Sequence, residues 1–265
     1  MWRLLVLLFC FFPLTAVGAR FDHRDWSELL ARHVDVREGG KVSLVDYRGM
    51  ATNRAQLEHY LDALARVPQA EYARWAENEQ LAFLINLYNA ATIELILQRY
   101  PELDSIRDLG SWFRSPWKRD FIALFGRQYS LDDIEHGMIR ADFTDPRIHF
   151  AVNCASIGCP MLRESAYTGS ELNEQLEEQT QRFLGDRSRN RASENALELS
   201  AIFKWYRDDF ARGWRGHHSL SEFLYDYRQA LGLSSRQARA LQENKLAIRF
   251  LDYDWRLNDV AGAPH

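Results

Sequence analysis

The stretch Glu79-Gln-Leu-Ala-Phe-Leu-Ile-Asn-Leu-Tyr-Asn-Ala-Ala-Thr-Ile93 has apolar side chains at almost every position. It lies inside a longer, nearly all-apolar run from Glu77 to Arg99, which Pro101 ends. A helix that is hydrophobic on all of its faces is buried among other elements. The sequence therefore predicts a central helix here, around which the rest of the chain packs.

The few polar residues of this predicted helix share one stripe. Glu79, Asn86 and Asn89 fall on neighbouring positions of a helical surface, because seven residues make nearly two turns. Buried amides need hydrogen-bond partners. Asn86 and Asn89 have two open interpretations: they hold the backbone of a neighbouring loop, or they form a substrate-binding wall of a cleft.

Outside this run, the periodicity of apolar residues predicts further helices and a few short strands. Ser130, followed by Asp133, forms a capping box at the start of one helix. Helices are expected over residues 25–33, 53–67, 130–140, 170–184, 202–212, 219–231 and 234–245, and strands over 42–47, 121–124, 128–130, 147–153, 196–200 and 248–253. The sum is an α+β fold, a predominantly helical single domain around a small, mainly antiparallel sheet.

Length and charge limit the classes of protein. The 265 residues include 33 Lys and Arg against 37 Asp and Glu, a net charge of −4, and 46% are hydrophobic. This composition is typical of a globular chain. Broad nucleic-acid binding needs a clustered basic surface, so we expect no nucleic-acid partner.

The N-terminus has the pattern of a secretory signal peptide. Arg3 precedes an apolar run from Leu4 to Pro13, and Val17 and Ala19 form the small-x-small pattern of a cleavage site. We expect residues 1–19 to be removed and residues 20–265 to form one globular domain. The predicted location is periplasmic or secreted, with no stable membrane span after cleavage.

The segment of residues 145–160 gathers the reactive side chains. It carries His149, Asn153, Cys154 and Cys159, and Cys154 directly follows the strand predicted for residues 147–153. Backbone N–H groups at a turn lower the pKa of a thiol and can also bind an oxyanion. The hypothesis is a Cys154 nucleophile with a histidine base and Asn153 or a glutamate as the orienting group.

The identity of the histidine stays open. Five extended residues span roughly 16 Å, so His149 reaches Cys154 only if the chain turns at Asn153. His136, which follows Glu135, is the nearest other candidate.

Two further interpretations of the cysteines remain. Four residues separate Cys154 from Cys159, and Gly158 and Pro160 can bend the loop, so a structural disulfide is sterically possible. Alternatively, Cys154 is buried and inert. The spacing is not Cys-x-x-Cys, so it gives little support to thioredoxin-like redox chemistry.

Residues 105–120 are rich in Trp, Arg and Ser and have little periodicity. Arg107 and Trp117 are candidates for binding a substrate there. Metal-ligand and phosphate-loop motifs are absent from the sequence, so we expect neither a metal nor a cofactor.

Several of these segments resemble the DUF547 family of proteins of unknown function. The matching stretches are residues 81–93, 105–108, 130–136, 145–160 and 253–258. They keep their order over most of the mature chain. The resemblance marks as a possible site Asn86, Asn89, Arg107, Glu135, His136, His149, Asn153, Cys154 and Cys159, and it assigns them no roles.

Three functional hypotheses follow. The first is a thiol-dependent enzyme that uses Cys154 for acyl or sulfur transfer on a small molecule or peptide. The second is a non-catalytic binding or scaffold domain with a Cys154–Cys159 disulfide. The third is a redox protein that cycles this cysteine pair.

Overall fold

The computed structural model describes residues 20–111 and 114–262. The predicted signal peptide, residues 1–19, lies outside the described residues. The first helices are α1 (Arg24–His33), α2 (Tyr47–Thr52), α3 (Arg54–Ala65), α4 (Gln69–Tyr72) and α5 (Glu77–Leu97). They are followed by α6 (Leu131–Ile134), α7 (Arg140–Asp142), α8 (Leu172–Gly185), α9 (Ile202–Trp205), α10 (Leu220–Asp226) and α11 (Ser235–Gln242).

The strands of the described residues form three small sheets. They are β1 (Val34–Arg37), β2 (Val42–Val45), β3 (Ile122–Leu124), β4 (Arg127–Tyr129), β5 (Arg191–Ala192), β6 (Ala196–Leu199) and β7 (Ala247–Phe250). The pairs β1–β2, β3–β4 and β5–β6 are antiparallel, whereas β6 and β7 are parallel. The predicted α+β class, mainly helical with mainly antiparallel pairing, is therefore confirmed, with the strands divided among separate sheets.

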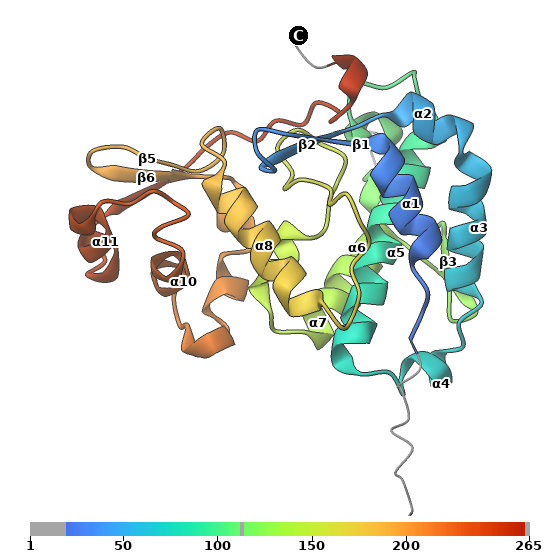
Figure 1. The fold of residues 1–265 in the computed structure, drawn as a ribbon, viewed down its shortest axis with the longest axis horizontal. Coiled ribbons are helices and arrows are strands. Elements are labelled where there is room, and N and C mark those ends of the chain that lie inside the picture. Colours follow the sequence, from blue (N-terminus) through green and yellow to red (C-terminus); the bar gives the residue numbers. More distant parts are fainter. Residues whose placement is uncertain (1–19, 112–113, 263–265) are drawn as a thin grey trace, which may run out of the picture.

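Helix α5 is the centre of the larger hydrophobic core. All of its residues from Leu81 to Leu97 are buried, and α2, α3, α6 and α8 pack against it. Figure 1 shows α1 and α3 beside it. Among the described helices, α5 alone is long and apolar enough to cross a membrane, but 89% of its most apolar window is buried inside the protein. Here it serves as a core helix, as its sequence predicts.

A second hydrophobic core lies beyond α8. It is built from aromatic rings in contact with one another, including Phe150, Phe183, Phe203 and Phe223, and it is covered by α10 and α11. Helix α8 joins the two cores, because Leu176 belongs to the first and Phe183 to the second. The long axis of the molecule runs from one core to the other (Figure 1).

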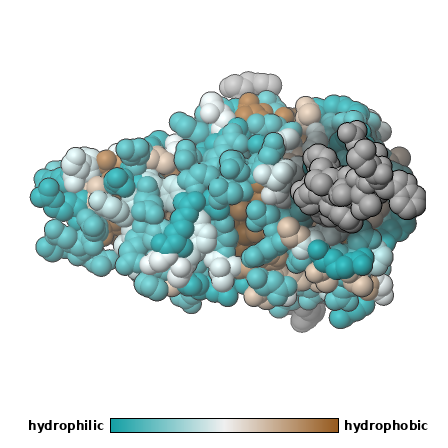
Figure 2. All heavy atoms as spheres, turned by 60° about the horizontal axis from the view of Figure 1, so that its bottom comes forward, coloured by the Kyte–Doolittle hydropathy of each residue, from teal (hydrophilic) through white to brown (hydrophobic). Residues whose placement is uncertain are grey.

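The face drawn in Figure 2 is largely hydrophilic, with hydrophobic side chains gathered near its middle. Trp205, at the end of α9, is a large hydrophobic residue with 47% of its surface exposed.

The predicted strand over residues 147–153 is wrong. Residues Pro146–Phe150 form a 3₁₀ helix that packs against α8. Pro146 suits the first position of a helix, and the Asp145 carboxylate accepts the Arg147 N–H at 2.9 Å. All five residues are buried, so the side chains do not alternate between a core face and a solvent face as those of an edge strand do.

Candidate functional site

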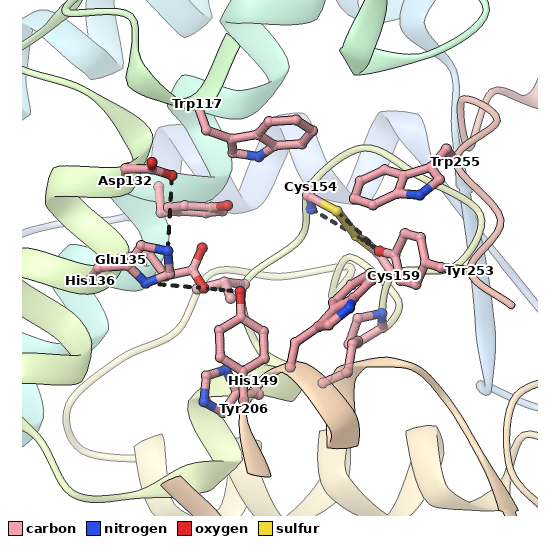
Figure 3. A pocket seen from close by; sticks show the side chains of 15 residues that line it. Trp117, Asp132, Glu135, His136, His149, Cys154, Cys159, Tyr206, Tyr253 and Trp255 are labelled. Carbon is pink, nitrogen blue, oxygen red and sulfur yellow. Dashed lines mark hydrogen bonds and ion pairs between the residues drawn. A yellow bond between two sulfur atoms is a disulfide. The ribbon is translucent and has the colours of Figure 1, made fainter. Parts of the chain in front are cut away.

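A cavity of about 240 Å³ opens between the two hydrophobic cores. Its walls come from α5, α6, α9, residues 151–160, which we call the cysteine loop, and the segment after β7. We call it the cysteine pocket, and its lining residues are Tyr88, Trp117, Asp132, Glu135, His136, His149, Val152, Cys154, Cys159, Pro160, Ile202, Trp205, Tyr206, Tyr253 and Trp255. Figure 3 shows sulfur atoms on one side and carboxylates with an imidazole on the other.

The cysteine loop is fixed to the central helix by amides. Asn89 on α5 accepts the Asn153 N–H at 2.8 Å and donates to the Ala151 carbonyl at 2.9 Å. Asn153 in turn accepts the Ala155 N–H and donates to the Pro160 carbonyl, both at 2.8 Å. These buried hydrogen bonds define the path of the backbone on both sides of Cys154.

The segment after β7 pairs with the backbone of the cysteine loop. The N–H groups of Ile157 and Gly158 donate to the carbonyls of Arg256 and Asp254, both at 2.8 Å. This pairing brings Tyr253 over Gly158, where a Cβ atom would lie 2.9 Å from the tyrosine ring. Only glycine leaves room for this approach.

Ala155 adopts a left-handed conformation in the same loop. Its φ of 60° is uncommon for a residue with a side chain and costs about 1 kcal/mol. The hydrogen bond from its N–H to Asn153 Oδ1 helps to hold it there. Strained backbone of this kind is concentrated at functional sites, so the turn supports a role for the adjacent Cys154.

Cys154 and Cys159 form a disulfide whose Cα atoms are 6.3 Å apart. The two sulfur atoms differ in their surroundings, since Cys159 is 3% exposed and Cys154 is half-buried. Cys159 Sγ accepts two hydrogen bonds, from the Cys154 N–H at 2.9 Å and from the Tyr253 hydroxyl at 3.0 Å. Cys154 Sγ lies 3.1 Å from the same hydroxyl (Figure 3).

Tyr253 is a neutral donor. Burial raises the pKa of its phenol, so the hydroxyl keeps its proton at physiological pH. A buried phenol that points at two sulfurs can stabilise a thiolate that forms at either one.

The wall of the cysteine pocket that faces the sulfurs comes from α6, the helix that begins after Ser130. The predicted capping box is confirmed, with Ser130 Oγ accepting the Asp133 N–H at 3.1 Å. The helix then widens into a π-helical turn over Glu135–Ile139 before α7. Asp132 and the π-turn residues Glu135 and His136 line the pocket. Turns of this kind occur frequently at functional sites.

Glu135 is a buried carboxylate held by a phenol. It is 6% exposed, and Oε1 accepts the Tyr206 hydroxyl at 2.7 Å. Glu135 also raises the pKa of the buried Tyr88, after the larger effect of burial. His136 Nδ1 lies 3.9 Å from Glu135 Oε1, and His136 Nε2 lies 3.9 Å from Asp132 Oδ1.

His149 lies beneath Tyr206. The two rings stack with centroids 4.0 Å apart, and His149 Nε2 is 2.7 Å from Asp209 Oδ2. Burial lowers the pKa of His149, whereas the Asp209 carboxylate opposes that effect. Arg140 binds both oxygens of Asp209, at 2.6 and 3.1 Å. His149 and Arg140 together hold the pKa of Asp209 below its usual range, against burial.

The structure brings six of the predicted site residues to one pocket: Trp117, Glu135, His136, His149, Cys154 and Cys159. Among the described residues, however, no histidine forms a hydrogen bond or ion pair with either sulfur. The partners of the sulfurs are Tyr253, the Cys154 N–H and, at 3.9 Å from Cys154 Sγ, Ser156 Oγ.

The other predicted residues lie outside the pocket lining. Asn89 and Asn153 hold the cysteine loop, and Asn86 pairs with the backbone of Tyr167 at 2.8 and 3.0 Å. Arg107 lines a neighbouring, more open cavity, with its guanidinium 5.4 Å from the Trp255 ring centroid. Within the described ranges, no group of three or more His, Cys, Asp and Glu side chains is arranged to hold a metal ion.

Sequence reasoning missed several lining residues. Tyr253 and Trp255 lie in the stretch of residues 253–258, which resembles the family motif but has no local pattern that predicts a position in the pocket. Trp205 ends α9 and Tyr206 follows it, and the sequence around them carries no signal beyond the periodicity that predicts a helix. Asp209, which holds His149, is 60 residues away from it in the chain.

Comparison with known proteins gives a family but no reaction. A family model described as "Protein of unknown function, DUF547" matches residues 72–184. No curated protein and no solved structure matches the chain. The matched range contains α5, the π-helical turn and both pocket cysteines. The match over residues 72–184 agrees with the resemblance of the motifs in that range.

Proposed function

We propose that the protein carries out thiol–disulfide exchange, with the Cys154–Cys159 pair as its reactive centre and the cysteine pocket as the binding site for a small thiol, a disulfide or a peptide cysteine. The observation that carries the proposal is the pair of hydrogen bonds to Cys159 Sγ, from the Cys154 N–H and the Tyr253 hydroxyl. Two donors aimed at one sulfur stabilise it as a thiolate, which is the leaving group in disulfide exchange.

The unequal burial of the two sulfurs supports different roles for them. Cys154 is half-buried and lines the pocket, so an incoming thiolate reaches its sulfur more readily than that of Cys159, which is 3% exposed. Attack on Cys154 Sγ forms a mixed disulfide and breaks the Cys154–Cys159 bond. The bonding electron pair leaves on Cys159 Sγ, next to its two donors.

A second substrate thiolate completes the cycle by attacking the substrate sulfur of the mixed disulfide. This step forms a substrate disulfide and releases Cys154 as a thiolate. In total, two substrate thiols are oxidised and lose two protons, and the protein disulfide is reduced to two thiols, which take up two protons. The reverse sequence reduces a bound disulfide.

The two single cysteine variants provide the test, with hydroxyethyl disulfide as the probe. In Cys159→Ser, the Cys154 thiol attacks the probe, and no second protein thiol resolves the adduct. We therefore expect a stable mixed disulfide, detected as added mass in the folded protein. Cys154→Ser leaves a buried thiol and is expected to react much more slowly.

The opposite order of reactivity, or equal rates in both variants, would overturn these roles. If neither variant reacts until the protein is unfolded, the disulfide is a structural staple of a binding or scaffold domain. Circular dichroism of both variants establishes that each one is folded in the assay.

One observation favours a second candidate, a thiol-nucleophile enzyme. Cys154 shares its pocket with His136 and Glu135, so reduction would free a thiol that faces an imidazole. This candidate predicts that the reduced protein hydrolyses or transfers an activated acyl group and that Cys159→Ser retains this activity. Exchange chemistry, in contrast, requires both cysteines for turnover.

The location is also a proposal. The signal-peptide pattern of residues 1–19 supports export to the periplasm or outside the cell, where disulfides persist and exchange reactions have substrates. Fractionation of cells that express the full-length chain tests this location.

A further inference from the structure

The charged groups that line the cysteine pocket are unbalanced. Asp132 and Glu135 contribute carboxylates, and no Lys or Arg side chain belongs to the lining formed by the described residues. The imidazole of His149 is buried, and its Nε2 already pairs with Asp209 Oδ2 at 2.7 Å, so it does not compensate these carboxylates. The pocket therefore presents negative charge beside the disulfide (Figure 3).

Glu135 lacks a cationic hydrogen-bond partner in the part of the chain that the structure describes. Its side chain is 8% exposed, and its hydrogen bond comes from the neutral phenol of Tyr206. A carboxylate removed from water in this way is costly unless a positive charge compensates it. Figure 3 shows the carboxylate pointing into the pocket, where a ligand can supply that charge.

The nearby cations are engaged elsewhere. Arg140 binds both oxygens of Asp209 and also lies 3.0 Å from His136 Nδ1 through its Nη1. Arginine has no acceptor, so His136 Nδ1 accepts this hydrogen bond and cannot also donate one to Glu135.

Asp132 adds a second, more accessible carboxylate. Its side chain is 28% exposed, and burial raises its pKa, an effect that Glu135 and Asp133 reinforce and that His136 and Lys118 oppose. Lys118 lies outside the pocket lining. A cation in the pocket would meet both carboxylates.

Aromatic rings surround the same space. Trp117 and Trp205 line the pocket, and each packs against Trp255, with ring centroids 5.7 Å apart in both pairs. Arg107 lies over Trp255 and Arg140 lies over Tyr206, so these two rings already have a cationic neighbour. Trp117 and Trp205 have no such neighbour among the described residues and are suited to hold a ligand cation by cation–π contact.

We propose that the cysteine pocket selects thiol or disulfide substrates that carry a positive charge, a primary ammonium or a guanidinium group, within a few bonds of the sulfur. Glu135 and Asp132 bind the cation, and the bound group then holds its sulfur near Cys154. This inference rests on the proposed exchange reaction for its chemistry, but the binding of the cation does not depend on that reaction.

The first test compares thiols of similar size and different charge: cysteamine, mercaptoethanol and mercaptopropionate. The rate of reduction of the protein disulfide by each thiol is divided by the rate of the same thiol with dithiodipyridine in solution, which corrects for intrinsic reactivity. We expect the corrected rates to fall in the order cationic, neutral, anionic, with about a tenfold advantage for cysteamine over mercaptoethanol, typical of a hydrogen bond to a charged group.

Variants locate the source of this preference. Glu135→Gln and Asp132→Asn should each lower the ratio of the corrected cysteamine rate to the corrected mercaptoethanol rate. Asp142→Asn is the matched control, because Asp142 is an exposed carboxylate on α7 outside the pocket lining, and it should retain the full preference.

The second test needs no exchange reaction. Butylammonium, butanol and butyrate are titrated against the oxidised protein, with tryptophan fluorescence as the readout. We expect saturable binding of butylammonium alone, weakened at least about tenfold in Glu135→Gln.

The outcomes separate the two proposals. Corrected rates that are equal for the three thiols, together with no binding of butylammonium, overturn the substrate class and leave the exchange function intact. Binding of butylammonium to a protein whose disulfide resists all three thiols overturns the exchange function and supports the cation site.

Discussion

The hydroxyl group of Tyr253 donates a hydrogen bond to Cys159 Sγ at 3.0 Å, although 94 positions separate the two residues in sequence. The backbone pairing of Ile157 and Gly158 with the segment after β7 brings them together. The buried sulfur of the disulfide thus has a fixed donor from the other end of the chain. This contact makes Cys159 a better leaving group than a sulfur in hydrocarbon surroundings.

Substitution of Tyr253 by phenylalanine should slow the reaction of the disulfide with thiols. The ring remains, but the leaving thiolate loses one of its two donors, which corresponds to about a tenfold lower rate. The free energy of unfolding should change by only about 1 kcal/mol. Stopped-flow measurement of disulfide reduction and urea titration test both values.

Tyr227→Phe is the control for this variant. Tyr227 donates a hydrogen bond to Glu177 at 3.0 Å in the second core, away from the sulfurs. It should lose a comparable amount of stability without any change in the rate of disulfide reduction. Equal rates in Tyr253→Phe and the wild type would show that the phenol does not assist the leaving sulfur.

Gly158→Ala should affect both stability and reactivity. The new Cβ would lie 2.9 Å from the Tyr253 ring, so the ring or the loop must move. Overpacking of this kind costs about 1–3 kcal/mol, and the displaced hydroxyl should slow exchange to the level of Tyr253→Phe. Gly137→Ala meets no atom within 4 Å and should leave the reaction rate at the wild-type value.

Removal of the Asn89 amide should loosen the cysteine loop. Asn89→Ala leaves the buried Asn153 N–H and Ala151 carbonyl without partners, which costs about 3 kcal/mol. Faster hydrogen exchange at residues 151–155 and an altered rate of disulfide reduction are expected. Mass spectrometry of deuterated peptides measures the first of these effects.

Asn86→Ala provides a matched comparison on the same helix. Asn86 forms the equivalent pair of hydrogen bonds with the backbone of Tyr167. A similar loss of stability is expected, with an unchanged rate of disulfide reduction. If both variants changed the rate equally, the effect would reflect global stability and not the position of the loop.

The stability of the fold should decline below neutral pH because of His23. Burial lowers the pKa of His23 to about 4, from 6.5 in an unfolded chain, and the Tyr60 hydroxyl lies 2.7 Å from its Nδ1. The unfolded state therefore binds a proton first as the pH falls. The contribution of a neutral His23, roughly 3 kcal/mol, is complete above pH 6.5 and is lost as the pH falls towards 4.

Urea titrations at several pH values test this decline. His23→Phe should be less stable than the wild type at pH 7, because Tyr60 loses its partner, and its stability should fall less between pH 6.5 and 4. His59→Gln, at an exposed position of α3, should retain the wild-type pH dependence. The same slope in His23→Phe and the wild type would assign the decline to other groups.

Much of the fold was predictable from local patterns. The apolar run of α5 identifies the buried helix, and Ser130 with Asp133 identifies the start of α6, since both signals depend on neighbouring residues. The strand expected over residues 147–153 failed because a buried 3₁₀ helix and a buried strand both lack polar alternation. Pro146 and the Asp145 cap were the signals for the correct structure.

The sequence predicts the cysteines of the site but not the residues that contact them. Cys154, Cys159, Glu135 and His136 were recognisable as chemically reactive residue types in ordered motifs. The contacts of Tyr253 with the sulfurs and of Asp209 with His149 depend on how distant segments pack. A single sequence carries no local signal for such pairs.

The most direct test of the exchange function is the mass of the intact, folded protein during incubation with millimolar mercaptoethanol at neutral pH. We expect a gain of two hydrogens within minutes, while circular dichroism stays unchanged and alkylation then labels Cys154 before Cys159. An unchanged protein mass under these conditions, with reduction only after urea unfolds the chain, would contradict the exchange function.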